Sequence, residues 1–294
     1  MRRRAFIEGI AASAAAWPRT GHAQAPAKIG RLGFLGATFA ASWDRRMEAF
    51  QSSLRDLGYL QGKNIFIEPR WAEERYNQLP VLAEELVRLR VDILLTYGTP
   101  GTLAAKQATT EIPIVFFYIG DAVSTGVVSS LARPGANVTG NTYFLTTTRG
   151  VNAAARPLGL QIQPLEAATS SEIDFAFTTL QRDHPDALFV GADPYFTARR
   201  IQIVQHAAHG SIPATYATRE TAEVGGLMSY GASIPDAYHM LGVYIGRILK
   251  GVKPPDLPVA QASKFELVIN HQTARMLGLT VPPSLLSIAD EVIE

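Results

Sequence analysis

The chain has 294 residues, which is enough for two lobes that each bury a core of their own. Its 27 basic and 26 acidic side chains give a net charge of +1, so the charge does not favour nucleic acid or an anionic membrane surface as a partner. The sequence contains no cysteine, which excludes a disulfide scaffold, thiolate metal sites and cysteine nucleophiles. We therefore expect a globular two-lobed protein without a metal or cofactor.

The amino terminus has the pattern of an export signal. Three arginines at positions 2–4 precede an apolar, alanine-rich stretch over 10–17, and small residues follow at 21–25. This order is typical of a secretory signal, and the arginines before Ala5 resemble a twin-arginine signal. We predict removal of residues 1–23; the alternative is an ordinary amphipathic helix. Because these residues hold four arginines and one glutamate, the mature chain would carry a net charge of −2.

The remaining chain alternates short apolar runs with amphipathic helices. Residues 29–36, 64–70 and 91–97 are predicted strands, and the intervening helices are expected over 43–58 and 79–89. In the first helix the apolar residues recur at steps of three and four, which places them on one face. Buried strands separated by such helices indicate an α/β fold with a parallel sheet covered on both faces.

Two stretches, 86–100 and 180–194, form a quasi-repeat in which leucine, arginine and aspartate occupy identical offsets. Each describes a strand that leads to a proline, and proline fits the first turn of a helix. The residue before each proline, Thr99 or Asp193, is a predicted helix cap. The repeat predicts two lobes of like construction.

The carboxyl ends of these strands are the predicted ligand-binding region, because open parallel sheets bind ligands there. The loops 97–102 and 191–196 would face each other across a cleft between the lobes. Each loop contains the start of a helix, whose free N–H groups attract a carboxylate. Gly98, Thr99 and Thr102 are therefore candidates for binding the carboxylate of a ligand.

Asp121 follows the predicted strand 114–118 and has two interpretations. It is either the N-cap of a helix that extends through Leu131 or the acceptor for a ligand ammonium group. Asp193 carries the same ambiguity on the opposite lobe. Further candidates lie beside these positions or near strand ends, where a tyrosine ring can stack on an apolar ligand side chain. They are Ala122, Tyr195, Tyr216 and Tyr230.

Several stretches in order along the chain, such as LARPGANVTG at 131–140, resemble the family of ABC-transporter substrate-binding proteins that includes tryptophan- and tyrosine-binding members. The other matching stretches are residues 57–64, 120–123, 190–200, 225–231 and 264–270. The resemblance implies two Rossmann-like lobes of the type I periplasmic-binding fold with a central ligand cleft. It places the first lobe at 28–122 with a return segment near 233–253, and the second at 140–232 and 262–294.

The resemblance also implies a function, which is the capture of an amino acid or related zwitterion by closure of the two lobes about a hinge. The protein would lie in the periplasm as a monomer and deliver its ligand to an ABC permease in the inner membrane, without catalysis. Two alternatives remain open. One is an enzyme that uses Asp121 or Asp193 as a general base, and the other is a ligand-sensing partner of a membrane receptor.

One segment departs from the family pattern. After residues 137–140 the family continues with a helix, a strand and the start of another helix, whereas here 146–150 runs directly into 151–156. The second lobe is therefore predicted to lack about one βα unit, since a βαβ unit takes ~30 residues. Residues 160–162 follow as a predicted strand. Losing a strand from a parallel sheet exposes an edge or forces a new pairing, and it removes one loop from the cleft.

Motifs of catalysis are missing from this sequence. It contains no Walker A motif and none of the patterns G-x-S-x-G, H-E-x-x-H and G-x-G-x-x-G. His206 and His209 lie three apart on a predicted helix, a spacing that suits a metal ion, but no third ligand is near them in sequence. We predict neither a catalytic residue nor a metal site.

Overall fold

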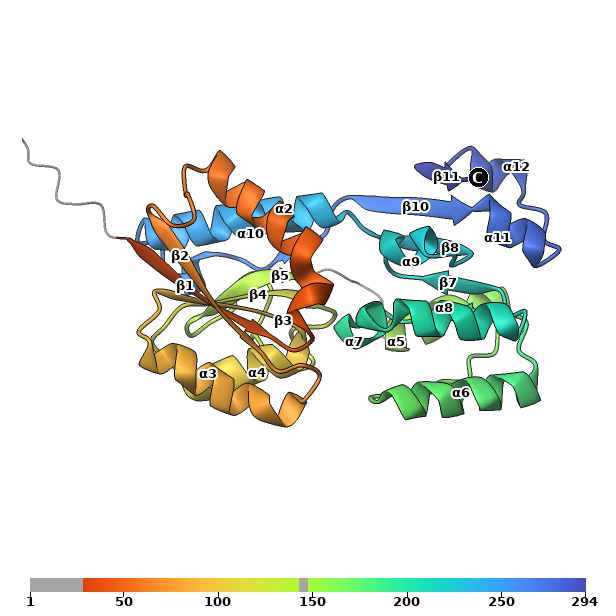
Figure 1. Ribbon diagram of the computed structural model, residues 1–294, viewed down its shortest axis with the longest axis horizontal. Coiled ribbons are helices and arrows are strands. Elements are labelled where there is room, and N and C mark those ends of the chain that lie inside the picture. The colour runs from red at the N-terminus through yellow and green to blue at the C-terminus, as the bar shows by residue number, and fades with distance from the viewer. Residues whose placement is uncertain (1–28, 143–147) are drawn as a thin grey trace, which may run out of the picture.

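The computed structural model describes residues 29–142 and 148–294 and shows two lobes, each built on its own sheet (Figure 1). The predicted signal at 1–23 lies outside the described residues. Within the described part of the chain, no helix is both long and apolar enough to span a bilayer.

The first lobe contains a six-stranded sheet in the order β2-β1-β3-β4-β5-β9, and all neighbouring strands run parallel. The strands are β1 (Gly30–Gly36), β2 (Ile65–Trp71), β3 (Ile93–Tyr97), β4 (Ile114–Ile119), β5 (Val138–Thr142) and β9 (Ala260–Gln261). The register places Leu32 of β1 opposite Ile93 of β3. The order of the first strands agrees with the α/β fold expected from the sequence.

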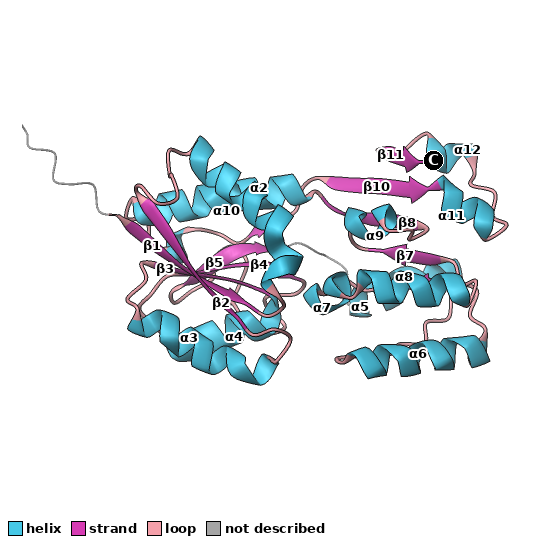
Figure 2. Ribbon diagram, viewed as in Figure 1, coloured by secondary structure: helices cyan, strands magenta, loops and turns pink. Residues whose placement is uncertain are grey.

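Four α-helices cover this sheet, two on each face (Figure 2). They are α2 (Asp44–Asp56) and α10 (Ile234–Leu249) on one face, and α3 (Leu79–Arg88) and α4 (Gly98–Ala108) on the other. Short 3₁₀ turns complete the lobe at η1 (Ala40–Trp43), η2 (Tyr76–Gln78) and η4 (Pro254–Asp256). Because helices pack on both faces, β3 and β4 are buried along their whole length, and their sequences are apolar and rich in β-branched and aromatic residues.

The second lobe contains a five-stranded sheet in the order β11-β10-β8-β7-β6. The strands are β6 (Leu188–Phe189), β7 (Ala214–Tyr216), β8 (Met228–Ala232), β10 (Phe265–Asn270) and β11 (Glu291–Ile293). Strands β8 and β10 pair antiparallel, so this sheet is mixed rather than parallel throughout as we expected. The other pairs are parallel.

Short helices surround this second sheet. They are α5 (Thr148–Ala155), η3 (Arg156–Leu158), α6 (Ser170–Asp183), α7 (Pro194–Ala198), α8 (Arg200–His209), α9 (Arg219–Glu223), α11 (His271–Met276) and α12 (Pro283–Leu286). Helix α6 packs against α8 and joins a core that is separate from that of the first lobe. This second core is small, and its buried apolar members are Ile173, Phe177, Tyr195, Ile203, Val204, Ala207, Ile212, Ala214 and Tyr216.

The chain passes between the two lobes three times. It leaves the first sheet after β5, returns from β8 into α10, and leaves again from β9 into β10 (Figure 1). Several connections between two lobes are the usual construction of a hinge, because small backbone rotations in each of them move one lobe against the other.

The predicted strand at 160–162 is wrong. Residues 160–166 are exposed and form no strand, and β6 is left as a two-residue edge with Phe189 44% exposed. A strand needs a neighbour for its backbone hydrogen bonds, and residues 160–162 pair with no strand in the described structure. The edge strand is short, which limits the surface it offers to other chains.

The predicted helix from Asp121 through Leu131 is also wrong. Turns occupy this segment instead. The Asp121 carboxylate accepts hydrogen bonds from the backbone N–H groups of Val123 and Ser124, at 3.1 and 2.9 Å. A short aspartate side chain that binds its own backbone in this way stabilises a turn as readily as a helix start.

Candidate ligand-binding site between the lobes

The first group of predicted site residues lies at the start of α4, where the first lobe meets the second. Gly98 adopts a left-handed φ of 69°, and a Cβ atom there would lie 3.3 Å from Cγ of Pro194 in the other lobe. Thr102 is buried, and its hydroxyl donates to the carbonyl of Gly98 at 2.8 Å. Thr99 is not the helix cap, since the cap position is Tyr97, which makes no side-chain capping bond. The two loops expected to face each other are therefore in contact.

Asp193 lies opposite, at the start of α7, and is the predicted helix cap. Its carboxylate accepts from the backbone N–H of Tyr195 at 2.7 Å. Removal from bulk water raises the pKa of Asp193 above its ordinary value, although the backbone donors of α7 oppose this. The ring of Tyr195 is buried in the second core beneath the guanidinium of Arg199, which lies 5.7 Å from its centroid.

The remaining predicted site residues are dispersed. Ala122 is buried in the first lobe beside the Asp121 turn. Tyr216 is buried in the second core, where removal from water raises the pKa of its phenol. Tyr230 is 59% exposed and stacks on Phe265 at 5.7 Å, so its ring packs along β8 and β10 rather than with the other candidates.

An ion pair that the sequence did not indicate joins the two lobes. Arg46 of α2 donates to Glu220 of α9, with 3.0 Å between Nη2 and Oε1. The guanidinium of Arg46 also lies 5.9 Å from the centroid of the Tyr118 ring. The two partners are 174 positions apart in the chain, so no local sequence pattern could have paired them. A second pair, Glu74 with Arg199, joins the lobes in the same way.

Tyr118 makes a third contact between the lobes. Its hydroxyl lies 2.9 Å from the hydroxyl of Thr197, and both side chains are buried. Because Thr197 donates its own proton to the carbonyl of Asp193, Tyr118 is the donor in this bond. The backbone of Tyr118 has a φ of 60°, at the point where the pairing of β4 with β5 changes register. A left-handed aromatic residue costs on the order of 1–3 kcal/mol, a strain that the surrounding contacts must hold in place.

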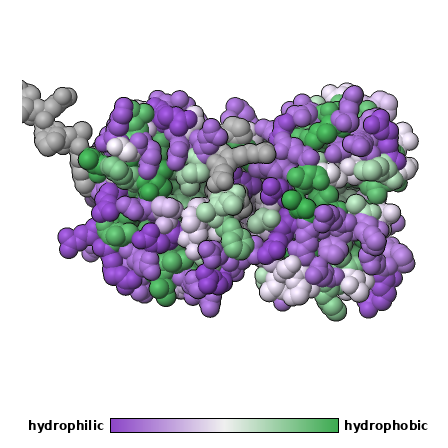
Figure 3. Space-filling model, viewed as in Figure 1, coloured by the Kyte–Doolittle hydropathy of each residue, from purple (hydrophilic) through white to green (hydrophobic). Residues whose placement is uncertain are grey.

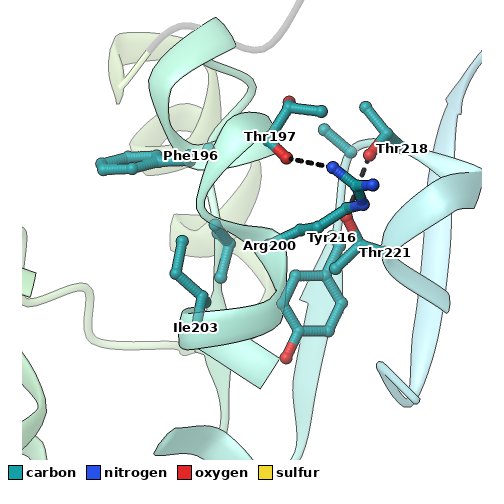
Figure 4. A pocket seen from close by; sticks show the side chains of 10 residues that line it. Phe196, Thr197, Arg200, Ile203, Tyr216, Thr218 and Thr221 are labelled. Carbon is teal, nitrogen blue, oxygen red and sulfur yellow. Dashed lines mark hydrogen bonds between the residues drawn. The ribbon is translucent and has the colours of Figure 1, made fainter. Parts of the chain in front are cut away.

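Thr197 also lines a small hollow in the second lobe (Figure 4). Its polar side chains are three threonines, Arg200 and Tyr216. Arg200 donates from Nη1 to the carbonyl of Thr197 at 3.1 Å, and the hydroxyls of Thr218 and Thr221 lie 2.9 Å apart. Among the described residues, the buried Nε of Arg200 and the buried Oε2 of Glu220 have no hydrogen-bond partner.

The described residues do not form a metal site. No group of three histidine, cysteine, aspartate or glutamate side chains within them could hold a metal ion. His206 instead bonds to Asp174 at 2.7 Å and stacks on Phe177, whose ring centroid lies 5.0 Å away.

A family model described as "ABC transporter substrate binding protein" matches residues 40–152 and 144–293. The chain belongs to this family. The two matched pieces overlap at 144–152, in the region where we expected a departure from the family pattern. The expected recognition and fold class are confirmed, and the chain is a solute-binding protein of an ABC transporter.

A relative and two solved structures are similar to this chain. The tyrosine-binding protein of Clostridioides difficile (strain R20291) is 25% identical over 269 residues, which are 81% of this chain and 78% of that protein. A conserved domain protein from Vibrio cholerae O1 biovar El Tor has the same fold, with a TM-score of 0.83 at 23% identity. The ABC domain from Streptococcus pneumonia in complex with L-Trp also gives 0.83, at 24% identity. Each alignment covers 90% of this chain and 100% of the other.

Proposed function

We propose that this solute-binding protein captures an amino acid with an aromatic side chain between its two lobes and presents it to the permease of an ABC importer. The observation that carries the proposal is that charged and polar side chains form the contacts between the two lobes. The contacts that cross it are an ion pair between Arg46 and Glu220, an ion pair between Glu74 and Arg199, and the hydrogen bond of Tyr118. A zwitterion carries both a positive and a negative charge, so it can form polar contacts of the same kind with charged side chains of either lobe.

Aromatic rings near this boundary support an aromatic ligand. Phe117 lies between Tyr97 and Tyr238, with centroids 5.7 and 5.8 Å away, and Tyr118 follows in the chain. Aromatic pairs prefer such tilted arrangements, so another ring can extend the cluster. The names of the relatives point the same way, since one is a tyrosine-binding protein and another was solved with L-Trp.

The predicted ligand contacts at Gly98, Thr99, Thr102 and Asp121 remain predictions. The start of α4 offers free N–H groups and a positive dipole end at the boundary, which favours a carboxylate. Asp121 and Asp193 are the acidic groups expected nearby for the ammonium. The family supports the other parts of the proposal, which are export to the periplasm, a monomeric state, docking on an inner-membrane permease and the absence of catalysis. The predicted signal at 1–23 supports export as well.

Calorimetric titration of the mature chain with L-tyrosine, L-tryptophan and L-phenylalanine tests the ligand class, with L-alanine and L-glutamate as controls. We expect the aromatic amino acids to bind at least tenfold more tightly than the controls. Mass spectrometry of the recovered ligand should show it unchanged, because the proposal excludes turnover. Absence of binding by all three aromatic amino acids, or chemical conversion of one of them, would refute the proposed function.

Export has a separate test. Protein recovered from the periplasm of a native host should have the mass of a chain that begins near residue 24. A mature protein that retains residues 1–4 would contradict the predicted signal.

A further inference from the structure

Two buried polar atoms in the second lobe have no partner among the described residues, and they carry opposite chemistry. Nε of Arg200 is a cationic donor, and Oε2 of Glu220 is an anionic acceptor. A buried polar group without a hydrogen bond lowers stability, and the loss is larger for a charged group. Such atoms are therefore expected where a protein satisfies them with something other than its own chain.

Each of the two side chains is held through one polar atom and has another polar atom without a partner. Arg200 is held by its Nη1 bond to the carbonyl of Thr197, and Glu220 is held by Arg46 through Oε1. Nε of Arg200 and Oε2 of Glu220 are thereby positioned without a hydrogen-bond partner. Positioned groups bind a ligand with a smaller loss of side-chain entropy than free ones.

The two side chains come from neighbouring elements at the hollow in the second lobe. Arg200 opens α8, Glu220 lies in α9, and these helices pack against each other. Thr218 and Thr221, which flank Glu220 in the chain, line the hollow together with Arg200 (Figure 4). No ion pair between Arg200 and Glu220 occurs in the described structure, so their opposite charges do not satisfy each other.

We infer that Arg200 binds the α-carboxylate of the ligand and Glu220 binds its α-ammonium, so that the second lobe holds both poles of the zwitterion. This inference rests on the proposed function and deepens it. It differs from the sequence-based expectation, which placed the carboxylate at the start of α4 and the ammonium at Asp121. Arg46 bonds the other oxygen of the same glutamate, so binding of the ligand at Oε2 is coupled to the contact between the lobes.

The test combines protein variants with ligands that lack one pole. Arg200→Met removes the donor, and tyramine is tyrosine without its carboxylate. We expect Arg200→Met to weaken L-tyrosine about ten- to a hundred-fold, the usual contribution of a charge-assisted hydrogen bond, and to leave tyramine affinity unchanged. Arg200→Lys keeps the charge but loses the Nε donor, so its affinity for L-tyrosine should lie between those of the wild type and Arg200→Met. This variant replaces Arg200→Met in the test if the methionine variant folds poorly.

The ammonium has a matching test. Glu220→Gln keeps the shape of the side chain and removes its charge, and 3-(4-hydroxyphenyl)propionate is tyrosine without its ammonium. The variant should weaken L-tyrosine about tenfold or more and leave the propionate unchanged or improved. Asp121→Asn is the matched control for the rival assignment, and Arg199→Met is the control for a neighbouring arginine. Both controls should change the affinity of each ligand and its analogue by the same factor.

The outcomes separate the inference from the function on which it rests. If the wild type binds none of the aromatic amino acids, the proposed function is wrong and this inference falls with it. If the wild type binds L-tyrosine but Arg200→Met weakens tyrosine and tyramine equally, the inference alone is overturned. Selective loss in Asp121→Asn instead of Glu220→Gln overturns it as well, and thermal melts of each variant verify that the folded protein was measured.

Discussion

Replacing Tyr118 by phenylalanine removes a single hydroxyl from the boundary between the lobes. In the structure this hydroxyl donates to Thr197 across that boundary, and both side chains are buried. Phenylalanine keeps the ring, which packs beneath the guanidinium of Arg46. The change therefore removes a buried hydrogen bond between the lobes and keeps the ring beside Arg46.

A buried neutral hydrogen bond contributes about 1 kcal/mol net, which corresponds to roughly a fivefold change in an equilibrium constant. Thr197 keeps the bond that it donates to Asp193, so no donor is left without an acceptor. We therefore expect Tyr118→Phe, without added ligand, to lower the ratio of closed to open molecules about fivefold. Lobe separation can be measured by energy transfer between dyes on cysteines introduced at exposed Glu84 and Gln181, because the chain has no cysteine of its own.

Tyr244→Phe is the matched control. Its hydroxyl donates to the carbonyl of Pro258 within the first lobe, so the same chemical change is made away from the boundary. The control should lower thermal stability slightly without changing the distance between the lobes. If Tyr118→Phe behaves as the control does, with a lower melting temperature and an unchanged distance, the hydrogen bond does not hold the lobes together and the reasoning fails.

Three further predictions concern stability. Gly231→Ala should lower the free energy of unfolding by about 3 kcal/mol or more in denaturant titrations, because its Cβ would lie 1.8 Å from the carbonyl oxygen of Ala217. Gly120→Ala is the control and should change the free energy of unfolding little, because its Cβ would meet no atom within 4 Å. Asp193→Asn should raise the melting temperature at pH 7 but not at pH 3. The pKa of Asp193 is raised in the folded state, so its charge destabilises that state only above the ordinary pKa of 3.8, and asparagine retains the helix cap. An equal gain in melting temperature at both pH values would contradict this. Backbone amides of 160–165 and of β6 should exchange with deuterium faster than those of β3, since the second core is small and its edge is unpaired; equal protection would show that the second lobe is as stable as the first.

Local patterns in the sequence predicted much of the first lobe. The helix expected at 79–89 is observed as Leu79–Arg88, and the strand expected at 91–97 is Ile93–Tyr97. Asp193 caps its helix as predicted, because the acceptor and the N–H groups that it binds are neighbours in the chain. Periodicity and caps are local properties, so the sequence records them directly.

Predictions that depended on tertiary neighbours were less successful. Residues 160–162 have a strand-forming sequence but no partner strand, and the acidic start expected for a helix at Asp121 forms a turn instead. The site was also incomplete, because Arg46 and Glu220 are ordinary charged residues in the sequence until the fold brings them together. Only the arrangement of the two lobes identifies their role at the boundary.

The molecule narrows between the lobes in the space-filling view (Figure 3), yet neither lobe is a continuous piece of chain. The first sheet receives its last strand at Ala260–Gln261, and the second is completed by Glu291–Ile293. During synthesis the first lobe therefore stays incomplete until most of the protein has been made, so the two lobes fold late and nearly together. Pairings between such distant segments slow folding, and a truncation before β9 would leave both sheets unfinished.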